Sequence, residues 1–287
     1  MTFYIVAGHA TETNVALVSA IRRLGVESTL LRPEQARRRV RDGDVVLGRV
    51  DVLPTLDGVE ACLWELRRLE RHGARVLNGV GALLASHDKL ATALRLARAG
   101  LRHPRTVHLD GRRPLPVLEP PLVLKPRFGS CGRDVVLCES DVAVERALDR
   151  LGRRRWFRRH GVLAQELVPP EGRDLRILVA GGEVVGAIER RPAPGEWRTN
   201  VALGGTRHAV TPPPDACETA VAAAHAVGGD FVGVDLLPSD EGWVVLELNG
   251  AVDFTREYSL EGRDVFHDAA LALAAESRIA LLPVPAL

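Results

Sequence analysis

The sequence predicts a mixed α/β fold in which a first α/β unit is followed by antiparallel strand hairpins. In the first 85 residues, short apolar runs alternate with segments whose apolar residues recur at helical spacing. Farther along, pairs of apolar strands are separated by short glycine-containing turns, which is typical of hairpins. With 287 residues, of which 46% are hydrophobic, the chain is long enough for two or three modules.

Three strands and two helices are predicted in the first unit. FYIVA (3–7) reads as a buried strand that ends in a glycine-containing turn, DVVLGRV (44–50) as a second strand and RVLN (75–78) as the closing one. Between them lie two apolar stripes at helical spacing. These stripes are Val15, Leu17, Val18, Ile21 and Leu24, and then Leu56, Val59, Leu63, Leu66 and Leu69.

Lysine is rare in this chain. Lys89 and Lys125 are the two lysines among 38 basic residues, and the others are arginine. Ser86 is a plausible N-cap for a helix over 87–99, which places Lys89 in the first turns of that helix. A cation there opposes the helix dipole unless an anion is near. The alternative is a solvated surface lysine.

Lys125 ends a predicted strand that leads into a glycine-containing loop. LVLK (122–125) and RDVVLC (133–138) flank the loop FGSCG (128–132) in a hairpin pattern. Glycines let backbone N–H groups approach an anion, and Ser130 adds a hydroxyl donor. The GxxxxGK[ST] phosphate loop is absent. A tight turn with a purely steric need for glycine is the alternative interpretation.

A carboxylate pair is predicted on the hairpin FVGVDLLPSDEGWVVLELN (231–249). Pairing around its Ser-Asp-Glu-Gly turn places Asp235 opposite Glu247, with Asn249 on the same face. Val234, Leu236, Leu246 and Leu248 are expected on the other face. Because facing like charges destabilise a sheet, the pair calls for a cation, and oxygen donors favour Mg²⁺ or Mn²⁺ over Zn²⁺. The alternatives are a one-residue slip in register, or neutralisation of the pair by Arg176.

The segment between the glycine loop and this hairpin carries further charged residues. VLAQELV (162–168), DLRILVA (174–180) and EVVGAIER (183–190) read as strands, the last two joined at Gly181-Gly182. Their polar residues, with those of the loop that follows, are Asp174, Arg176, Arg190, Arg191, Arg198, Thr199 and Asn200. The sequence thus combines two lysines, several arginines, a glycine loop and a carboxylate pair. This combination is typical of a site that binds magnesium and a polyphosphate.

The order of these motifs resembles that of the ATP-grasp ligases, specifically the RimK/LysX branch. The matching motifs are SHDK (86–89), KPRFGSCGR (125–133), QELV (165–168), GRDLR (172–176), ERR (189–191), TN…GG (199–205), GVD (233–235) and ELN (247–249). The resemblance implies an ATP-grasp fold with an N-terminal α/β pre-domain at 1–85, a central domain with a glycine-rich lid at 86–165, and a C-terminal antiparallel-sheet ATP- and Mg-binding domain at 166–287.

The resemblance also implies a role for each matching residue. Lys89 and Lys125 would contact the ATP phosphates, where an ammonium fits a crowded pocket better than a guanidinium. The remaining nucleotide contacts would be Ser130 and Gly132 over the γ-phosphate, Glu166, Leu167 and Val168 at adenine, and Asp174 at the ribose. Asp235, Glu247 and Asn249 would hold Mg²⁺. Two ions are implied, bridged by Glu247, and Mn²⁺ could replace Mg²⁺. Arg191, Asn200 and Arg176, together with Lys125, would serve catalysis.

The activity implied is ATP-dependent ligation of a carboxylate to an amine through an acyl phosphate. After Asn249, RimK-like ligases have a small residue, Pro and Gly, whereas this chain has GAVDF (250–254). This segment is closer to the pattern of LysX-like ligases. The resemblance therefore implies a substrate in which a carrier protein or peptide bears the reacting glutamate. Small amino-acid metabolites are the other substrate class. A small-molecule kinase and a catalytically silent ATP-binding regulator are the alternative functions, and the family suggests a homo-oligomer.

Composition limits the other partners. The formal net charge of +1 argues against nucleic acid and anionic membranes. The arginine runs at 37–39 and 153–159 are expected to be solvated helix faces. The chain shows no apolar stretch of about 18 residues and no secretory leader, so we expect a cytoplasmic protein. Its four cysteines lack paired metal spacing and are expected to be reduced.

Overall fold

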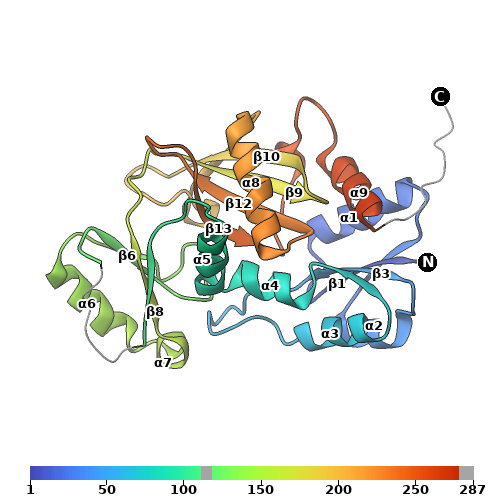
Figure 1. Cartoon of the computed structure of the whole chain (residues 1–287), viewed down its shortest axis with the longest axis horizontal. Helices are drawn as coiled ribbons and strands as arrows, with labels where there is room; N and C mark the ends of the chain where they lie inside the picture. Colours follow the sequence, from blue (N-terminus) through green and yellow to red (C-terminus); the bar gives the residue numbers. More distant parts are fainter. Residues whose placement is uncertain (111–117, 278–287) are drawn as a thin grey trace.

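Three sheets organise the computed structural model, which describes residues 1–110 and 118–277 (Figure 1). The N-terminal sheet is parallel, in the order β2-β1-β3-β4. Parallel neighbours need crossover connections, which the helices of this unit provide. Its elements are β1 (Phe3–Ala7), α1 (Glu12–Arg23), β2 (Ser28–Leu31), α2 (Pro33–Arg39), β3 (Val45–Arg49), α3 (Leu63–Arg71) and β4 (Arg75–Leu77).

The three strands expected in this unit are confirmed, and one helix is shorter than its apolar stripe. The helix α3 begins at Leu63, so Leu56 and Val59 lie before it. Val59 forms a bridge with Val52, and Leu56 has a φ of 59°, which a right-handed helix does not allow. Both residues are apolar because they are buried or partly buried in the connection before α3. Helical spacing alone does not distinguish such a buried connection from a helix.

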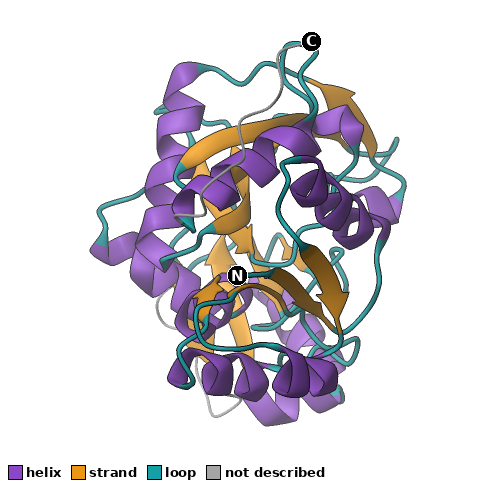
Figure 2. Cartoon of the chain, turned by 90° about the vertical axis from the view of Figure 1, so that its right-hand side faces the viewer, coloured by secondary structure: helices purple, strands orange, loops and turns teal. Residues whose placement is uncertain are grey.

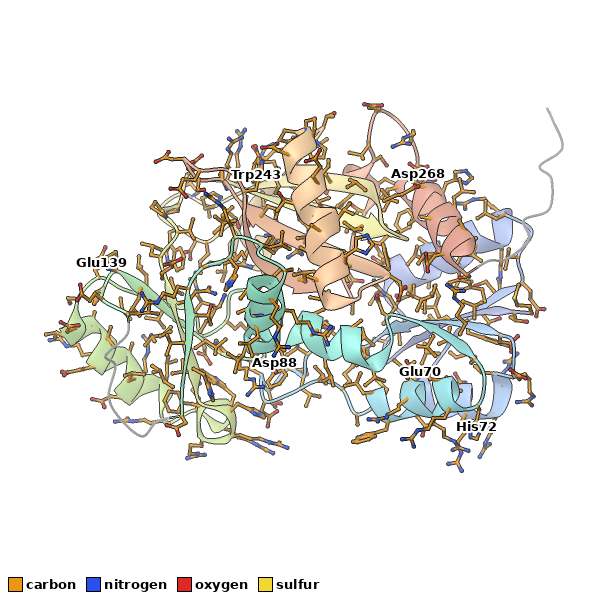
Figure 3. All side chains as sticks on the ribbon, in the orientation of Figure 1. Glu70, His72, Asp88, Glu139, Trp243 and Asp268 are labelled. Atoms are coloured by element: carbon orange, nitrogen blue, oxygen red, sulfur yellow. The ribbon has the colours of Figure 1, made fainter. Side chains whose placement is uncertain are left out.

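The helix expected from His87 to Ala99 is divided at Asp88. Helix α4 (Val80–His87) ends there, and α5 (Lys89–Arg98) begins. The Asp88 carboxylate accepts hydrogen bonds from the backbone N–H groups of Leu90 and Ala91, so Asp88, labelled in Figure 3, is the N-cap. The expectation for Ser86 was therefore wrong: its hydroxyl donates to the Ala82 carbonyl inside α4.

The central sheet is antiparallel, in the order β5-β8-β6-β7. Its elements are β5 (Thr106–Leu109), β6 (Leu122–Lys125), β7 (Val136–Cys138), α6 (Asp141–Leu151), α7 (Arg155–His160) and β8 (Val162–Glu166). Trp156 of α7 is buried against this sheet, whereas the arginines of the 153–159 run are exposed, as expected. The arginines at 37–39 are exposed in the last turn of α2, where their charge complements the helix dipole.

The C-terminal sheet has the order β11-β10-β9-β12-β13, and all its pairs are antiparallel. Its elements are β9 (Asp174–Ala180), β10 (Glu183–Arg191), the 3-10 helix η1 (Val201–Leu203), β11 (Thr206–Ala209), α8 (Pro214–Val227), β12 (Phe231–Leu237), β13 (Val244–Asn249), the 3-10 helix η2 (Arg256–Tyr258) and α9 (Val265–Glu276). The predicted hairpins β9–β10 and β12–β13 are both confirmed.

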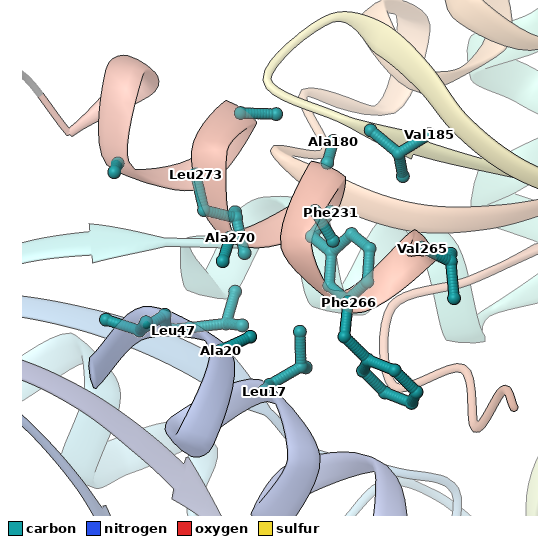
Figure 4. Close-up of a cluster of buried hydrophobic side chains, with 14 of the residues drawn as sticks. Leu17, Ala20, Leu47, Ala180, Val185, Phe231, Val265, Phe266, Ala270 and Leu273 are labelled. Carbon is teal, nitrogen blue, oxygen red and sulfur yellow. The ribbon is translucent and has the colours of Figure 1, made fainter. Parts of the chain in front are cut away.

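Buried side chains join the N-terminal unit to the C-terminal sheet. Figure 4 shows Leu17 and Ala20 of α1 facing Ala270 and Leu273 of α9, with Phe231 beside them, and these residues belong to one continuous core. A second core packs α8 on the other face of the same sheet. In the side view, helices surround the strands of the molecule (Figure 2). Within the described ranges, no helix has both the length and the apolar character needed to cross a membrane.

Candidate active site

A pocket lies where residues of the central sheet meet residues of the C-terminal sheet. It contains about 980 Å³ of space, a figure that includes the solvent at its open side. Eleven of the predicted site residues line it: Lys89, Lys125, Ser130, Gly132, Glu166, Leu167, Val168, Asp174, Asn200, Asp235 and Glu247. Arg176, Arg191 and Asn249 are not among its lining residues.

Both lysines are held inside this pocket. Lys125 ends β6 and is 4% exposed, and Lys89 is the first residue of α5. The Lys89 ammonium donates to the Gly129 carbonyl at 2.6 Å and lies 3.2 Å from a Glu247 carboxylate oxygen. Its side chain is 12% exposed, so the alternative of a solvated surface lysine is wrong. The lysine at the positive end of α5 is tolerated because an acidic partner lies beside it.

The buried Lys125 ammonium is destabilising, and the cost depends on pH. Burial lowers the pKa of Lys125 to about 8, although Glu247 opposes this shift. Below pH 8 the folded protein buries the full charge of Lys125. Between pH 8 and the ordinary pKa of about 10.5, the unfolded chain binds more protons than the folded protein does. The free energy of unfolding therefore rises with pH in this range. Since a tenfold change in a protonation equilibrium corresponds to about 1.4 kcal/mol, the cost at neutral pH is about 3 kcal/mol.

We therefore expect Lys125→Met to raise the free energy of unfolding at pH 7 by up to about 3 kcal/mol, the charge penalty estimated above. The difference from the unmodified protein should shrink as the pH rises from 8 to 10. Denaturant unfolding of both proteins at several pH values measures it. A difference that stays constant with pH would show that the charge of Lys125 is not what destabilises the fold.

The glycine loop (126–135) connects β6 to β7 and is held over the pocket. The predicted strand at 133–138 begins only at Val136, which lengthens the loop. The Arg198 guanidinium donates to the Gly132 carbonyl at 2.8 Å. Gly132 has a φ of 67°, and a Cβ added there would lie 2.6 Å from the Asn200 amide oxygen. Glycine is therefore required at 132 by both backbone conformation and close packing.

Gly132→Ala and Cys131→Ala form a matched pair in this loop. We expect Gly132→Ala to displace the loop from Asn200 and to lower the rate of ADP formation by about tenfold, because a misplaced contact of this size costs one to two powers of ten. Cys131 is exposed and already carries a Cβ, so Cys131→Ala should keep nearly full activity. Steady-state assays of both variants measure the effect, and equal rates would show that the loop tolerates the added methyl group.

The β12–β13 hairpin has the predicted register. Asp235 pairs with Glu247, and Gly233 pairs with Asn249, so the alternative of a one-residue slip is wrong. A β-bulge follows Asp235, because Leu236 pairs with Val245. The bulge reverses the alternation along β13: Leu246 lines the pocket and Val245 enters the core. The expectation that Leu246 points away from the site was therefore wrong.

Arginines already neutralise Asp235. Arg176, its pairing partner on β9, donates to both carboxylate oxygens at 2.6 and 2.7 Å, and Arg190 donates to one of them at 2.7 Å. Burial raises the pKa of the Asp235 carboxyl, but the two guanidinium groups outweigh it and hold that pKa below its usual range. Neutralisation by Arg176, one of the alternatives considered above, is thus present in this structure.

Asp235→Asn tests this ion-pair network. The side chain of Asp235 is 3% exposed, so removing its charge leaves the largely buried Arg176 without a carboxylate partner and leaves Arg190 with Asp174 alone. We expect a loss of about 3–5 kcal/mol in the free energy of unfolding. Glu241→Gln is the control, because its partner Arg102 lies in an exposed pair in which the glutamate is 77% exposed, and it should cost less than about 1 kcal/mol. Similar losses in both variants would contradict a special role for Asp235.

Two neighbouring arginines on β10 face opposite sides of the sheet. Arg190 is buried and lines the pocket, donating through two nitrogens to Asp174 at 2.6 and 2.7 Å. Arg191 is 58% exposed and bound to Glu189 at 2.7 Å, outside the pocket. Arg190 therefore lines the pocket, whereas Arg191, which we expected to serve catalysis, lies outside it. Period-two alternation places Arg190 and Arg191 on opposite faces of β10. The sequence would identify Arg190 as the pocket residue only if Asp235 and Asp174 were known to lie beside the strand.

Asp174 and Asn249 also have specific partners. Asp174 lies at the pocket wall, where it accepts hydrogen bonds from Arg190 and from the Thr199 hydroxyl. Burial raises its pKa despite the ion pair with Arg190. Asn249 accepts a hydrogen bond from the backbone N–H of Ala251 at 2.8 Å, so its amide orients the chain that leaves β13.

The other end of the pocket is more apolar. Leu167 and Val168 follow β8 directly, and Leu237 and Leu246 face the pocket from the β12–β13 hairpin. Glu166 accepts a hydrogen bond from the backbone N–H of Arg105 at 2.8 Å, which fixes the chain where β8 ends. A flat, partly apolar group fits between these walls, next to the charged end that holds the lysines.

The chain matches proteins of known family along most of its length. The model of the RimK-like ATP-grasp domain matches residues 87–269. A probable alpha-L-glutamate ligase of Aeromonas salmonicida (strain A449) is 34% identical over 234 residues, which cover 79% of this chain and 76% of the relative. A protein of the same description from Pseudomonas paraeruginosa (strain DSM 24068 / PA7) is 32% identical over 228 residues, covering 77% and 73%.

Solved structures share the fold. The RimK domain protein ATP-grasp from Sphaerobacter thermophilus DSM 20745 superposes with a TM-score of 0.68 at 22% identity, covering 95% of this chain and 99% of the other. The D-alanine–D-alanine ligase from Bacillus anthracis has a TM-score of 0.68 at 15% identity and covers 97% of both chains. With its three sheets, its two pocket lysines and its carboxylate hairpin, the chain belongs to the RimK-like ATP-grasp family and is an ATP-dependent ligase that forms C–N bonds.

Proposed function

We propose that this ligase joins an amino acid or other amine to a glutamate-type carboxylate, on a carrier protein, a peptide or a small metabolite, through an acyl phosphate. The observation that carries the proposal is the pocket in which two lysines and two carboxylates meet beneath the glycine loop. Relatives described as probable alpha-L-glutamate ligases support the carboxylate class, and the structure of the ATP-grasp ligase PsnB with a precursor peptide supports a peptide substrate.

The residues that we propose to bind ATP extend along the pocket. Leu167, Val168 and the chain at Glu166 hold adenine, with Leu246 added as an apolar wall, and Asp174 lies toward the ribose. Lys89, Lys125, Ser130 and Gly132 surround the phosphates. The domain boundaries near residues 85 and 165, which we also propose, place this nucleotide site between the central and C-terminal domains.

The carboxylate hairpin offers Glu247 to a magnesium ion, whereas the carboxylate of Asp235 is already bound by Arg176 and Arg190. Its donors are oxygen atoms, which Mg²⁺ prefers, and one oxygen of Glu247 has no partner within the described residues. Glu247, Asp235 and Asn249 would hold the metal, and a second ion would share Glu247. Bound Mg²⁺ neutralises phosphate oxygens and orients them for in-line transfer.

The chain's own residues then position and stabilise the reacting groups. Lys125 and Arg190 hold positive charge where negative charge develops on the transferred phosphoryl group, with Arg176 keeping Asp235 in place. Asn200 contacts the glycine loop, and the closed loop excludes water so that an amine, rather than water, meets the acyl phosphate. The substrate carboxylate attacks the γ-phosphorus and ADP leaves; the amine then attacks the carbonyl, loses a proton and displaces phosphate.

Hydroxylamine trapping tests the proposal. ADP release is measured with Mg·ATP against glutamate-terminated peptides, carrier proteins and free amino acids, with hydroxylamine present. We expect a hydroxamate from one carboxylate class, which would identify the acyl substrate. A stable phosphorylated product without a hydroxamate would instead show a kinase, and ATP binding without turnover on any of these compounds would contradict the ligase proposal.

A further inference from the structure

A loop of the N-terminal unit reaches the central sheet. This loop (51–60), which we call the strap, connects β3 to α3. The backbones of Val52 and Val59 form a bridge, and the backbone N–H of Leu53 donates to the Gly58 carbonyl at 2.9 Å. Because these backbone groups are paired within the strap, its tip keeps a defined shape.

The tip of the strap contributes a side chain to the core of the central sheet. Leu56 is 5% exposed and belongs to the same buried cluster as Leu122 and Leu124 of β6 and Trp156 of α7. Its φ of 59° is one that residues other than glycine rarely adopt, and such a conformation persists where the surrounding packing holds it. The strand β6 ends with Lys125, so the strap packs into the core that supports this lysine.

Asp57 adds charged contacts next to Leu56. Its side chain is 3% exposed, and one carboxylate oxygen lies 3.2 Å from Arg155 Nε and 3.4 Å from Arg159 Nη1, both on α7. The Thr55 hydroxyl donates to the other oxygen. Thr55 and the two arginines hold the pKa of the Asp57 carboxyl below its usual value, although burial opposes them. The carboxylate is therefore charged at neutral pH and joins the N-terminal unit to α7 by ion pairs.

The strap also contacts the glycine loop. The Arg133 guanidinium donates to the Pro54 carbonyl at 3.0 Å, and Arg133 lines the candidate active site. His160, the last residue of α7, donates from Nε2 to the Asp57 carbonyl at 2.8 Å, and its ring lies edge-on to that of Phe128, with 5.0 Å between the centroids. Both contacts lead from the tip of the strap to the glycine loop, so the position of one depends on the other.

We propose that the strap holds the central sheet and its glycine loop over the nucleotide pocket before ATP binds, with Leu56 and Asp57 as positioning residues. This inference rests on the proposed nucleotide site and adds the control of its assembly. When only a fraction of the molecules has the binding-competent arrangement, the apparent affinity falls by that fraction. Contacts that keep the pocket assembled therefore raise the affinity for ATP and leave the chemical step to Lys125 and its neighbours.

Nucleotide affinity tests the role of Asp57. A non-hydrolysable ATP analogue with Mg²⁺ is titrated into the full chain by calorimetry. We expect Asp57→Asn, which removes the charge but keeps the size, to weaken binding by about fivefold or more, because fewer molecules have the assembled pocket. Glu145→Gln, at an exposed position on α6 of the same unit, is the control and should bind normally. Unchanged binding by Asp57→Asn would overturn the proposal.

Steady-state kinetics distinguish positioning from catalysis. Asp57→Asn should raise the KM for ATP by a similar factor and keep kcat within about twofold, because saturating ATP restores the assembled pocket by mass action. A fall in kcat with an unchanged KM would place Asp57 in the chemical step and contradict a positioning role.

Hydrogen exchange distinguishes positioning from damage to the fold. In Asp57→Asn without nucleotide, the amides of the glycine loop and of α7 should exchange faster, while those of the N-terminal sheet keep their rates. A purely structural role of Asp57 in its own unit would instead speed exchange in the N-terminal sheet and leave the glycine loop unchanged, which would overturn the proposal.

Arginine variants test the ion pairs without changing a buried residue. Arg155→Met and Arg159→Met, combined, should weaken the analogue as Asp57→Asn does, and adding Asp57→Asn to them should cause no further loss, because residues in one network are not additive. The two arginine side chains are 73% and 58% exposed, so this comparison is available even if Asp57→Asn does not fold. Additive losses would show that Asp57 does not act through α7.

The same measurements distinguish failure of this inference from failure of the proposed function. If analogue binding depends on Lys125 but not on Asp57, the strap has no positioning role and the nucleotide site stands. If binding depends on Asp57 but no hydroxamate forms with any carboxylate, the strap stands and the acyl-phosphate mechanism is wrong. Absence of analogue binding by the unmodified protein would overturn both.

Discussion

Lys125→Met should reduce the rate of ADP formation by about 100- to 1,000-fold, the range observed when one donor to a developing charge is removed from an active site. Lys125 is almost fully buried, ends β6 and lines the pocket, but its ammonium group forms no hydrogen bond or ion pair within the part of the chain that the structure describes. A buried ammonium without a partner is unfavourable for folding. Its retention is explained if a phosphate is the partner that it meets during the reaction.

The substitution separates function from stability because the two effects have opposite signs. Lys125→Met removes a buried charge and should leave the fold more stable at neutral pH, while activity falls. A loss of activity through misfolding would instead appear with a lower free energy of unfolding. Activity within about fivefold of the unmodified enzyme, in a protein with the expected gain in stability, would contradict the phosphate role of Lys125.

Lys125→Arg addresses why the position is lysine in an arginine-rich chain. Arginine keeps the charge but has a larger, planar head group that needs two-point geometry. We therefore expect Lys125→Arg to be nearly as inactive as Lys125→Met. Arg153→Ala, at an exposed position on the α6–α7 connection, is a control for the preparation and should retain full activity.

Motif order and strand alternation predicted much of the site. The hairpins β9–β10 and β12–β13 are local, so the turn residues determine their pairing, and Asp235 opposite Glu247 followed from counting residues. The orientation of Leu246 was predicted wrongly because a bulge inserts one extra residue into the alternation of β13. No glycine or proline at the bulge indicates its position in the sequence.

Long-range charge pairing was also beyond the sequence. Arg190 and Arg191 are identical in type and adjacent, and their roles differ because Asp174 and Asp235, on two other strands, both lie beside Arg190. Similarly, Ser86 and Asp88 are both good N-cap residues, and tertiary packing of α4 on the C-terminal sheet decides between them. The hydrogen bond from Arg49 to Asp253 likewise joins two residues that are 204 positions apart in the sequence.

Glu247→Gln should lower the maximal rate by about 100-fold and raise the Mg²⁺ concentration needed for half-maximal activity. Glutamine has nearly the same size and keeps an oxygen, but it lacks the charge that attracts a divalent cation. The charge also matters to Lys89, whose ammonium lies 3.2 Å from Glu247 and bonds to the glycine loop. Loss of the metal and loss of the lysine's partner must therefore be distinguished.

Metal titration makes that distinction. If Glu247 binds the metal, raising Mg²⁺ or replacing it by Mn²⁺ should recover part of the rate of Glu247→Gln, since added metal offsets a weaker site by mass action. If Glu247 only positions Lys89, the rate of the variant should be low at every metal concentration. Glu241→Gln, on the exposed turn of the same hairpin, should show the unmodified Mg²⁺ dependence. An unchanged Mg²⁺ dependence in Glu247→Gln would contradict metal binding by Glu247 and would leave the ion pairs with Lys89, Arg176 and Arg190 as what allows two carboxylates to face each other on β12 and β13.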